Sequence, residues 1–327
     1  MLMSTNFSER YATMQFRSIT PAEVTAFATI AGDAERSAAI AEMLGGYLAE
    51  EISSPRLMWV AEDGSQWLGR VAYTSNRGET TPDYLVWLET PPQEDDLAIA
   101  STLIQRSLRE ILAQVQAASP HEVEAILDAP GPFTADPIRS ASLLTAGGFH
   151  LLVDRRRFEW THNDPLPAAP TRLIFQTLDE VGEEAFTATM ARIIEGTLDN
   201  YTQELAQSVG TLEAARRHFH EEQRNQKRWE PHWWQLGSLP TGEVVGVIMP
   251  AENIRWPNIG YIGVVPDQRG HGYSQDLLAQ GTRTLIAEGA ERIIADTDLG
   301  NTPMANTFLR MGYRQFATRQ FWKLTVV

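Results

Sequence analysis

The sequence predicts an α+β protein of two tandem domains, each with a mixed, mostly antiparallel central sheet flanked by helices. The chain has 327 residues, about the length of two ordinary domains. Its two halves end alike, because Gly148-Phe149 recurs as Gly312-Tyr313, 164 positions later. Strand and helix patterns also follow in the same order in both halves. We therefore expect an N-terminal domain at 1–162, a linker at 163–170 and a C-terminal domain at 171–327.

The first half opens with a short alternating strand at 16–19, after which Thr20-Pro21 provides a helix N-cap and a proline at the first helical position. We expect one or two helices within 21–52. The remaining elements are expected as strands 57–62, 67–74 and 84–90, helix 96–116, strand 123–128, helix 137–146 and a terminal strand pair. The segment 163–170 has three prolines, which a helix or a central strand does not accept, so it is expected as the linker.

The second half repeats this order. The segment 175–178 alternates like the first strand, and Asp179 is expected as the N-cap of the following helix. The other elements are expected as helices within 180–228, strands 232–238, 243–250 and 259–265, helix 273–288, strand 291–297, helix 302–311 and a terminal strand pair. Because the strands run mostly in meanders with one β-α-β crossover per half, the pattern favours a mixed sheet over a doubly wound one.

The composition narrows the classes of function. Hydrophobic residues make up 43% and charged residues 21%, as in globular proteins, so extensive disorder is excluded. The net charge of −15 repels phosphate backbones and anionic lipids, so we expect neither a nucleic-acid nor a membrane partner. The chain has no cysteine, which excludes disulfides and thiolate chemistry. It also has no long apolar run or signal sequence, and a cytoplasmic location is expected.

The sharpest local signal is the segment 259–274. An apolar strand ends at Pro266, crosses a turn that contains Gly270 and Gly272, and enters a helix. Glycines allow a close approach of the backbone, and the free N–H groups of a helix start attract a diphosphate, to which Arg269 can add its charge. A Walker A loop is excluded, because no Gly-Lys-Ser/Thr follows. A dinucleotide motif lacks its third glycine, but Asp296 could serve as a ribose-binding acid, so a nicotinamide dinucleotide-binding enzyme stays an alternative.

Arg269, Gly272 and Ser274 have the spacing R/Q-x-x-G-x-G/A, and this run resembles motif A of the GNAT N-acetyltransferase superfamily. The segment 301–313, which ends in Gly312-Tyr313, resembles the later motif of the same family. The resemblance covers roughly 170–327. The first half shares the order of elements and the glycine-aromatic ending, which points to a tandem-domain member.

The resemblance implies an N-acetyltransferase, an acyltransferase of groups other than amino-acyl groups, with acetyl-CoA or another acyl-CoA as co-substrate between strands 259–265 and 291–297. The acyl group would pass by direct attack to the primary amine of a small molecule, and the net charge favours a cationic acceptor. No metal is expected, and the protein would be a monomer or homodimer. The residues expected to bind the co-substrate are Ile262, Gly263, Val264, Arg269, Gly270, His271, Gly272, Tyr273, Ser274, Asn301 and Phe308.

Two proton-transfer roles stay open. Phe308 stands where many family members have a tyrosine that protonates the departing thiolate, and Tyr261 is a candidate substitute. A chain without this acid also agrees with a non-catalytic acyl-CoA-binding or sensor protein, which is a further alternative. The candidate bases for the amine are Asp296, Asp298, Glu252 and His232, among which the sequence does not choose.

Two other features are expected to carry no ligand. His218 and His220 lie two positions apart, so on a helix their side chains diverge by about 200° and cannot share a metal ion. They are expected on a polar helix face. In the first half, the acids Glu94, Asp95 and Asp96 replace the glycines of the turn. Carboxylates suit a helix start and repel a diphosphate, so the first half is expected to bind no co-substrate.

Overall fold

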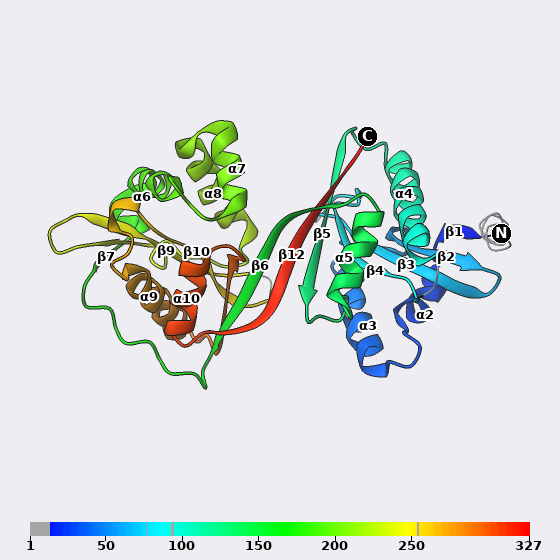
Figure 1. Cartoon of the computed structure of the whole chain (residues 1–327), viewed down its shortest axis with the longest axis horizontal. Coiled ribbons are helices and arrows are strands. Elements are labelled where there is room, and N and C mark those ends of the chain that lie inside the picture. Colours follow the sequence, from blue (N-terminus) through cyan, green and yellow to red (C-terminus); the bar gives the residue numbers. More distant parts are fainter. Residues whose placement is uncertain (1–13, 77, 93–94, 254) are drawn as a thin grey trace, which may run out of the picture. The chain divides into compact units, whose positions relative to one another are not determined.

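The computed structural model describes residues 14–76, 78–92, 95–253 and 255–327, which fold into two compact units (Figure 1). Unit 1 comprises the chain up to Leu152 together with Arg319–Val327, and unit 2 comprises Val153–Thr318. Within the described ranges, no helix has the length and hydropathy needed to cross a membrane.

Unit 1 is built on an antiparallel meander that ends in one parallel pair. The meander strands are β1 (Gln15–Ser18), β2 (Met58–Asp63), β3 (Gln66–Thr74) and β4 (Tyr84–Glu89). The crossover helix α4 (Asp96–Val115) then returns the chain to β5 (His121–Ala129), which is parallel to β4. The other helices of the unit are α2 (Val24–Ala28), α3 (Ala34–Ala49) and α5 (Pro137–Ala146).

Alternation along β2 gives unit 1 a core on each face of its sheet. Trp59 and Ala61 belong to the core that includes residues of α4 and α5, whereas Met58 and Val60 belong to the core that includes residues of α2 and α3. This is the two-residue period of a strand that is buried on both faces.

Unit 2 repeats the plan. Its antiparallel meander consists of β7 (Ile174–Thr177), β8 (Gln235–Ser238), β9 (Val244–Glu252) and β10 (Pro257–Val264). The crossover helix α9 (Tyr273–Ala287) leads to β11 (Arg292–Asp298), which is parallel to β10. The remaining helices are α6 (Leu178–Ile194), α7 (Asn200–Val209), α8 (Thr211–Asn225) and α10 (Thr302–Arg310).

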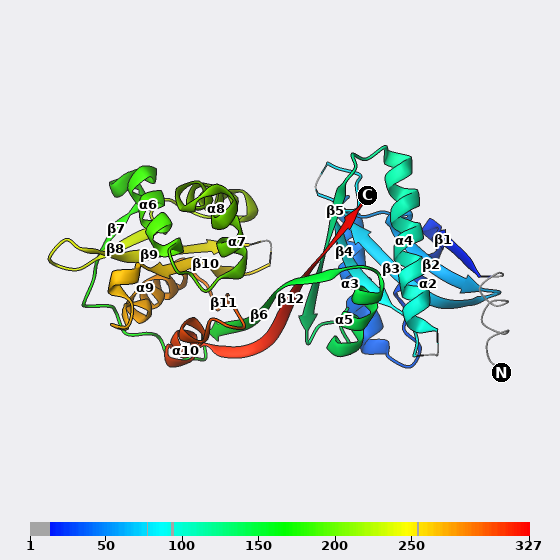
Figure 2. The ribbon, with the colours of Figure 1, turned by 45° about the horizontal axis from the view of Figure 1, so that its top comes forward.

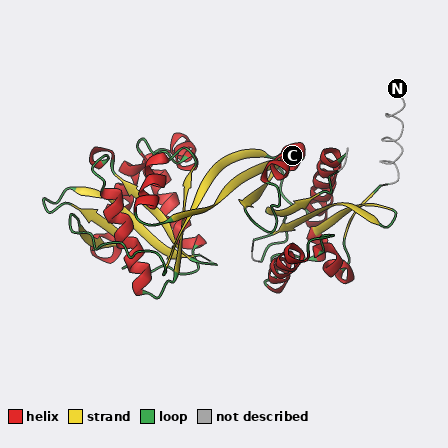
Figure 3. Cartoon of the chain, turned by 60° about the horizontal axis from the view of Figure 1, so that its bottom comes forward, coloured by secondary structure: helices red, strands yellow, loops and turns green. Residues whose placement is uncertain are grey.

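Helices cover both faces of the sheet in unit 2. In Figure 2, α6, α7 and α8 lie on one side of β8, β9 and β10, and α9 lies on the other. Figure 3 shows helices on both faces of the strands in each unit. This mostly antiparallel topology is the predicted mixed α+β class, and it does not fit the doubly wound sheet that the dinucleotide alternative requires.

The units differ from the predicted domains at their ends. Instead of a terminal strand pair, each half ends in one long strand, β6 (His150–Thr161) and β12 (Arg314–Val326). Most of β6 belongs to unit 2, where it pairs with β11. The end of β12 belongs to unit 1, where Trp322 joins the core and Arg319 bonds Asp128 at 2.6 Å. Each half therefore gives its last strand to the unit formed mainly by the other half.

Two local predictions are wrong. The N-cap of α6 is Thr177, which forms a capping box with Glu180, so Asp179 lies inside the first turn. The predicted strand 232–238 begins only at Gln235. The preceding residues form turns, and both Trp233 and Trp234 are buried.

Candidate active site

A cavity of about 580 Å³ opens in unit 2 where β10 and β11 separate. In the described residues, the two parallel strands are paired at Asn258 opposite Ile294, whereas β10 continues to Val264. Beyond the paired position, Tyr261 to Val264 line the cavity from β10, and Asp296 and Thr297 line it from β11. The parting of the strands thus creates the site, as expected from the sequence.

The edge of β10 that faces this cavity is open. Its other edge pairs with β9, where Ile262 lies opposite Ile248 and Val264 opposite Gly246. An open edge carries backbone N–H and C=O groups, which can bind an extended amide-containing ligand as an added strand. Gly263 lets α6 pack tightly against β10, because a Cβ at this position would lie 2.4 Å from Ile193 Cγ2.

The strand leads into a turn that is suited to an anion. Gly270 and Gly272 have φ angles of 83° and 76°, and Gly272 is the N-cap of α9. The first N–H groups of a helix have no intrahelical acceptor and lie at the positive end of the helix dipole. Gly270, Gly272, Tyr273 and Ser274 line the cavity. The start of α9 can therefore hold a diphosphate at the end of the open edge.

Arg172, which the sequence analysis missed, holds this turn from outside. Its guanidinium donates at 3.0 Å to the carbonyl oxygens of both His271 and Gly272, and it also pairs with the buried Asp276 of α9. The bond to Asp276 raises the pKa of Arg172, so the cation is firmly held. Because the C=O and N–H of a trans peptide point in opposite directions, binding these carbonyls orients the amides of the turn.

The side chain of Arg269 binds the protein's own backbone. Its guanidinium donates to four carbonyl oxygens, at 2.8 Å to Ile193, 2.9 Å to Gly196, 3.1 Å to Val264 and 3.2 Å to Glu195. It thereby caps the C-terminal end of α6, where a cation is favourable. On the wall of the cavity, the positive charge of Arg269 therefore faces carbonyl oxygens of the protein's own backbone.

The remaining predicted co-substrate residues divide into two groups. Ser274 lines the cavity and shares a 2.9 Å hydroxyl contact with Thr307 of α10. Asn301 also lines the cavity and is the N-cap of α10, where its Oδ1 accepts from Met304 N. His271 is exposed, and it is not among the residues that line the cavity.

Tyr261 and Phe308 occupy the cavity wall in different ways. Phe308 is 1% exposed, with ring centroids 5.0 Å from Phe158 and 5.5 Å from Tyr313, so it belongs to the core at the cavity floor. Tyr261 lines the cavity from β10, and burial raises its pKa. Its hydroxyl therefore stays protonated at neutral pH and can donate a hydrogen bond or a proton.

Asp296 and Asp298, two of the predicted bases, both bind other groups of the protein. Asp296 lines the cavity and pairs with Arg157 at 3.2 Å. Asp298 is 2% exposed, and its two oxygens accept from Arg155 Nε at 2.9 Å and from Asn200 N at 2.8 Å. Burial raises the pKa of Asp298, but both oxygens are used to join β6, β11 and the start of α7.

Glu252 and His232 lie elsewhere. Glu252 is opposite Pro257, at the beginning of β10, and it pairs with Lys227 at 3.2 Å. Since β9 and β10 are antiparallel, the end of β9 is far along the sheet from the open edge near Val264. His232 is largely exposed, 3.9 Å from Glu288. Neither residue lines the cavity, so we do not retain them as bases.

His218 and Glu222 do line the cavity, which the sequence analysis did not predict. Both lie on α8, and the His218 ring centroid is 4.8 Å from that of Tyr261. His220 diverges as expected, with a 45% exposed side chain beside Glu183. The expectation of a polar face was wrong for His218, because it shares a helix face with the buried Ala214 and Ala215. His218 lies four residues after Ala214 and three after Ala215, and this spacing could have indicated that its side chain lies on the buried face of the helix.

The model of the GNAT acetyltransferase family matches residues 199–313, the segment that contains most of the cavity wall. Residues 199–313 are therefore similar to GNAT acetyltransferases. No curated protein matches the sequence significantly. The predicted family resemblance is confirmed for this segment, and members of the family transfer acyl groups from acyl-CoA.

Solved structures extend the GNAT fold to both units. A GCN5-related N-acetyltransferase from Sphaerobacter thermophilus is 15% identical, with 96% of each chain covered and a TM-score of 0.56. A conserved protein of unknown function from Staphylococcus epidermidis is 11% identical over 79% of this chain and 91% of its own, with a TM-score of 0.51. A tandem GNAT protein from the clavulanic acid biosynthesis pathway is 14% identical over 95% and 98%, with a TM-score of 0.47. The first of these covers nearly the whole chain, so the predicted fold class is confirmed.

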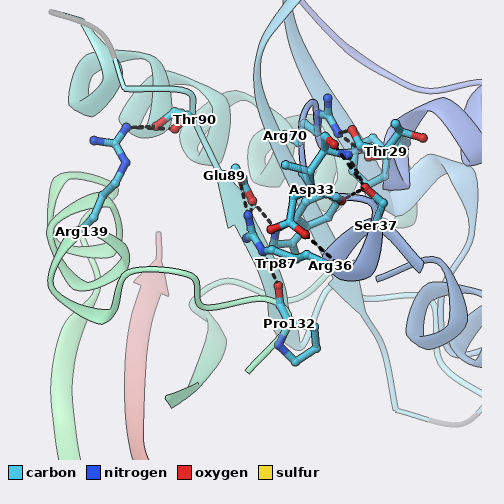
Figure 4. Close-up of polar contacts among 12 residues, drawn as sticks. Thr29, Asp33, Arg36, Ser37, Arg70, Trp87, Glu89, Thr90, Pro132 and Arg139 are labelled. Carbon is cyan, nitrogen blue, oxygen red and sulfur yellow. Dashed lines mark hydrogen bonds and ion pairs between the residues drawn. The ribbon is translucent and has the colours of Figure 1, made fainter. Parts of the chain in front are cut away.

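In unit 1, Arg139 and Arg36 bind groups at the end of β4 and directly after it (Figure 4). Arg139 of α5 donates to Thr90 O at 2.9 Å and pairs with Asp96, the first residue of α4, at 2.5 Å. Arg36 of α3 binds both carboxylate oxygens of Glu89, at 2.9 and 2.5 Å. An arginine and an aspartate thus meet at the start of the crossover helix of unit 1. Glu94, one of the three predicted acids, lies outside the described residues.

Proposed function

We propose that unit 2 binds acetyl-CoA, or another short acyl-CoA, and transfers its acyl group to the primary amine of a small acceptor. One observation carries this proposal: a single cavity joins the open edge of β10 to the N-terminus of α9. An acyl-CoA has an amide-containing arm that suits such an edge and a diphosphate that suits such a helix start.

The groups proposed to hold the co-substrate follow from this placement. Backbone groups of Ile262 to Val264 would bind the amide arm, and amides from Gly270 to Ser274 would bind the diphosphate. Asn301 and Phe308 would complete the wall, and Tyr261 would donate a proton to the departing thiolate. Arg269 would hold the end of α6 in place at the cavity wall, and it would not pair directly with the diphosphate.

We further propose that unit 1 binds no acyl-CoA. The carboxylate of Asp96 stands at the start of α4, where it satisfies the positive end of the helix dipole and repels a diphosphate. Arg139 pairs with this carboxylate and donates to Thr90, the residue that follows β4. The stoichiometry would therefore be one acyl-CoA per chain.

Acyl transfer is tested by mixing the protein with acetyl-CoA and a panel of amines and recording free thiol. Amine-dependent release of CoA thiol, with acetylated amine found by mass spectrometry, is the expected result. Phe308 motivates a second candidate, a sensor that binds acyl-CoA without turnover, because phenylalanine cannot protonate a thiolate. Tight binding of acetyl-CoA with no thiol release across a broad amine panel would favour the sensor.

The position of the site is tested with two glycines of similar conformation. Gly272 (φ 76°) lies in the turn before α9, whereas Gly242 (φ 92°) lies in the loop between β8 and β9. An alanine at either position strains the backbone by roughly 1 kcal/mol. Gly272→Ala should lower acetyl-CoA affinity about tenfold or more by displacing the amides, whereas Gly242→Ala should leave the affinity unchanged. Equal affinities of the two variants would place the diphosphate elsewhere.

A further inference from the structure

The least explained group in the cavity wall is His218. Its side chain is 16% exposed, and its Nδ1 atom is buried without a hydrogen-bond partner in the described part of the chain. Buried polar atoms are nearly always hydrogen-bonded, and exceptions occur at catalytic positions. The packing of α8 does not require a histidine here, because the neighbouring buried residues Ala214, Ala215 and Phe219 are apolar.

Glu222 gives this imidazole a local negative charge. Its Oε1 lies 3.6 Å from His218 Nε2, one helical turn away, and its Oε2 accepts from Gln226 Nε2 at 2.8 Å. The Glu222 side chain is 18% exposed, and no lysine or arginine of the described residues forms an ion pair with it. A carboxylate in this setting stabilises positive charge, either on a protonated imidazole or on a bound ammonium group.

Both residues are beside the proposed acyl-transfer site. The ring of His218 meets Tyr261 edge to face, with an interplanar angle of 66°. Tyr261 lines the cavity from β10, together with Ile262, Gly263 and Val264 that follow it. Gly260 allows Glu222 to lie close to β10, because a Cβ at position 260 would lie 2.5 Å from Glu222 Oε2.

We infer that His218 is the general base of the reaction and that Glu222 positions the cationic amine and the charged imidazole. This inference rests on the proposed function. The acceptor enters as an ammonium ion, and the imidazole of His218, which lines the cavity, accepts one of its protons, so that the nitrogen gains a lone pair. That lone pair forms the bond to the acyl carbon. The carbon–sulfur bond then breaks and its electron pair leaves with sulfur. Tyr261 protonates the thiolate, and the second proton of the nitrogen replaces the proton that Tyr261 gave. His218 finally returns its proton to water, so the products are the amide, the thiol and one proton.

The same geometry favours an acceptor that carries a protonated amine. Charged groups face the space around His218 from several elements. The acids are Glu222 on α8, Asp199 before α7 and Asp296 on β11. The cations are Arg155 on β6 and Arg269 after β10, and Tyr261 contributes a phenol from β10. Arg155 pairs with Asp199 and Asp298, and Asp296 pairs with Arg157. Glu222 is the acid in this set whose neighbour is a histidine.

His220 provides a matched control, because it lies on the same helix with an exposed side chain. With the best amine of the panel, His218→Gln should lower kcat/KM about 10²-fold or more, while His220→Gln keeps the wild-type value. Both variants should bind acetyl-CoA within about twofold of wild type, since the base contacts the amine. The acid limb of the wild-type pH–rate profile should disappear in His218→Gln.

A readout that does not depend on turnover comes from NMR. The imidazole signal that His218→Gln removes should shift when acetyl-CoA saturates the protein, and the signal of His220 should not. A second variant, Glu222→Gln, leaves the ring in place and serves if His218→Gln does not fold. It should raise the KM for the amine, because the bound ammonium group loses a stabilising charge.

The inference is overturned if His218→Gln folds, binds acetyl-CoA and retains its rate, or if Glu222→Gln leaves the KM for the amine unchanged. Either result would leave the proposed function intact. The proposed function itself fails only if the wild-type protein shows no binding of acetyl-CoA, or no amine-dependent release of thiol.

Discussion

Replacing Arg269 by lysine separates two roles that an arginine can have beside a diphosphate. Lysine keeps the positive charge but cannot present a rigid fork of donors. In the structure, the fork is what matters: Nε and both Nη atoms donate to carbonyl oxygens of Val264, Ile193, Glu195 and Gly196. We therefore predict that Arg269→Lys, although it keeps the charge, loses stability and affinity in the same direction as Arg269→Met and to a smaller extent.

The size of the effect follows from the bonds that are lost. A lysine ammonium can replace one or two of the four contacts, so two or three are lost. At about 1 kcal/mol for each bond at this partly exposed position, the free energy of unfolding should fall by about 2 kcal/mol. The segment after α6 forms part of the cavity wall, and its loosening should raise the Kd for acetyl-CoA about tenfold.

Denaturant unfolding and calorimetric titration with acetyl-CoA measure the two effects. Arg192→Lys is the control, because Arg192 is also near the end of α6 and makes only a 3.8 Å contact with the exposed Asp267. It should change neither stability nor affinity. Our reasoning is refuted if Arg269→Lys keeps wild-type stability and affinity while Arg269→Met loses affinity alone, because the charge would then be the functional feature.

Two further predictions concern proton transfer and acid stability. Tyr261→Phe should lower kcat about 10²-fold with an unchanged Kd for acetyl-CoA, since the phenol is the proposed donor to the thiolate; steady-state kinetics and calorimetry test this, and an unaltered kcat would remove Tyr261 from the mechanism. In unit 1, the hydrogen bond from Arg17, with help from the Thr20 amide, lowers the pKa of Glu23 from 4.5 to about 2. A lowered pKa of an acid stabilises the fold above the unfolded-state value and loses this effect as the pH falls toward 2. The stability difference between wild type and Glu23→Gln in denaturant unfolding should therefore be largest near pH 6 and shrink toward pH 2, and a difference that does not depend on pH would contradict it.

The elements of the fold could be predicted where their signals are local. The helix expected at 137–146 is α5 (Pro137–Ala146), because Asp136 caps its start, Pro137 occupies the first position and the glycines 147 and 148 end it. The exchange of terminal strands could not be predicted, because it depends on which strand lies beside β11. Arg155 and Arg157 match Asp298 and Asp296 across that pairing, but nothing near them in the sequence shows it.

The part of the site that is contiguous in the sequence could be predicted, as the local elements of the fold could. The turn from Val265 to Ser274 is contiguous, so one motif located the strand edge, the glycines and the helix start. Glu252 does not reach the cavity, because β9 is antiparallel to β10 and its last residues lie beside the first residues of β10. Arg172 and His218 were missed because they reach the site from segments about 100 and 40 residues away, where only the three-dimensional packing of unit 2 brings them to β10 and α9.

The most direct test of this account is the number of acetyl-CoA molecules that one chain binds, measured by equilibrium dialysis with labelled acetyl-CoA. We predict one per chain, located in unit 2, with binding weakened by Gly272→Ala and unaffected by Arg139→Ala in unit 1. Two sites per chain would show that Asp96 and Arg139 do not close the region in unit 1. The absence of any binding would contradict the assignment of the cavity between β10 and β11 to an acyl-CoA.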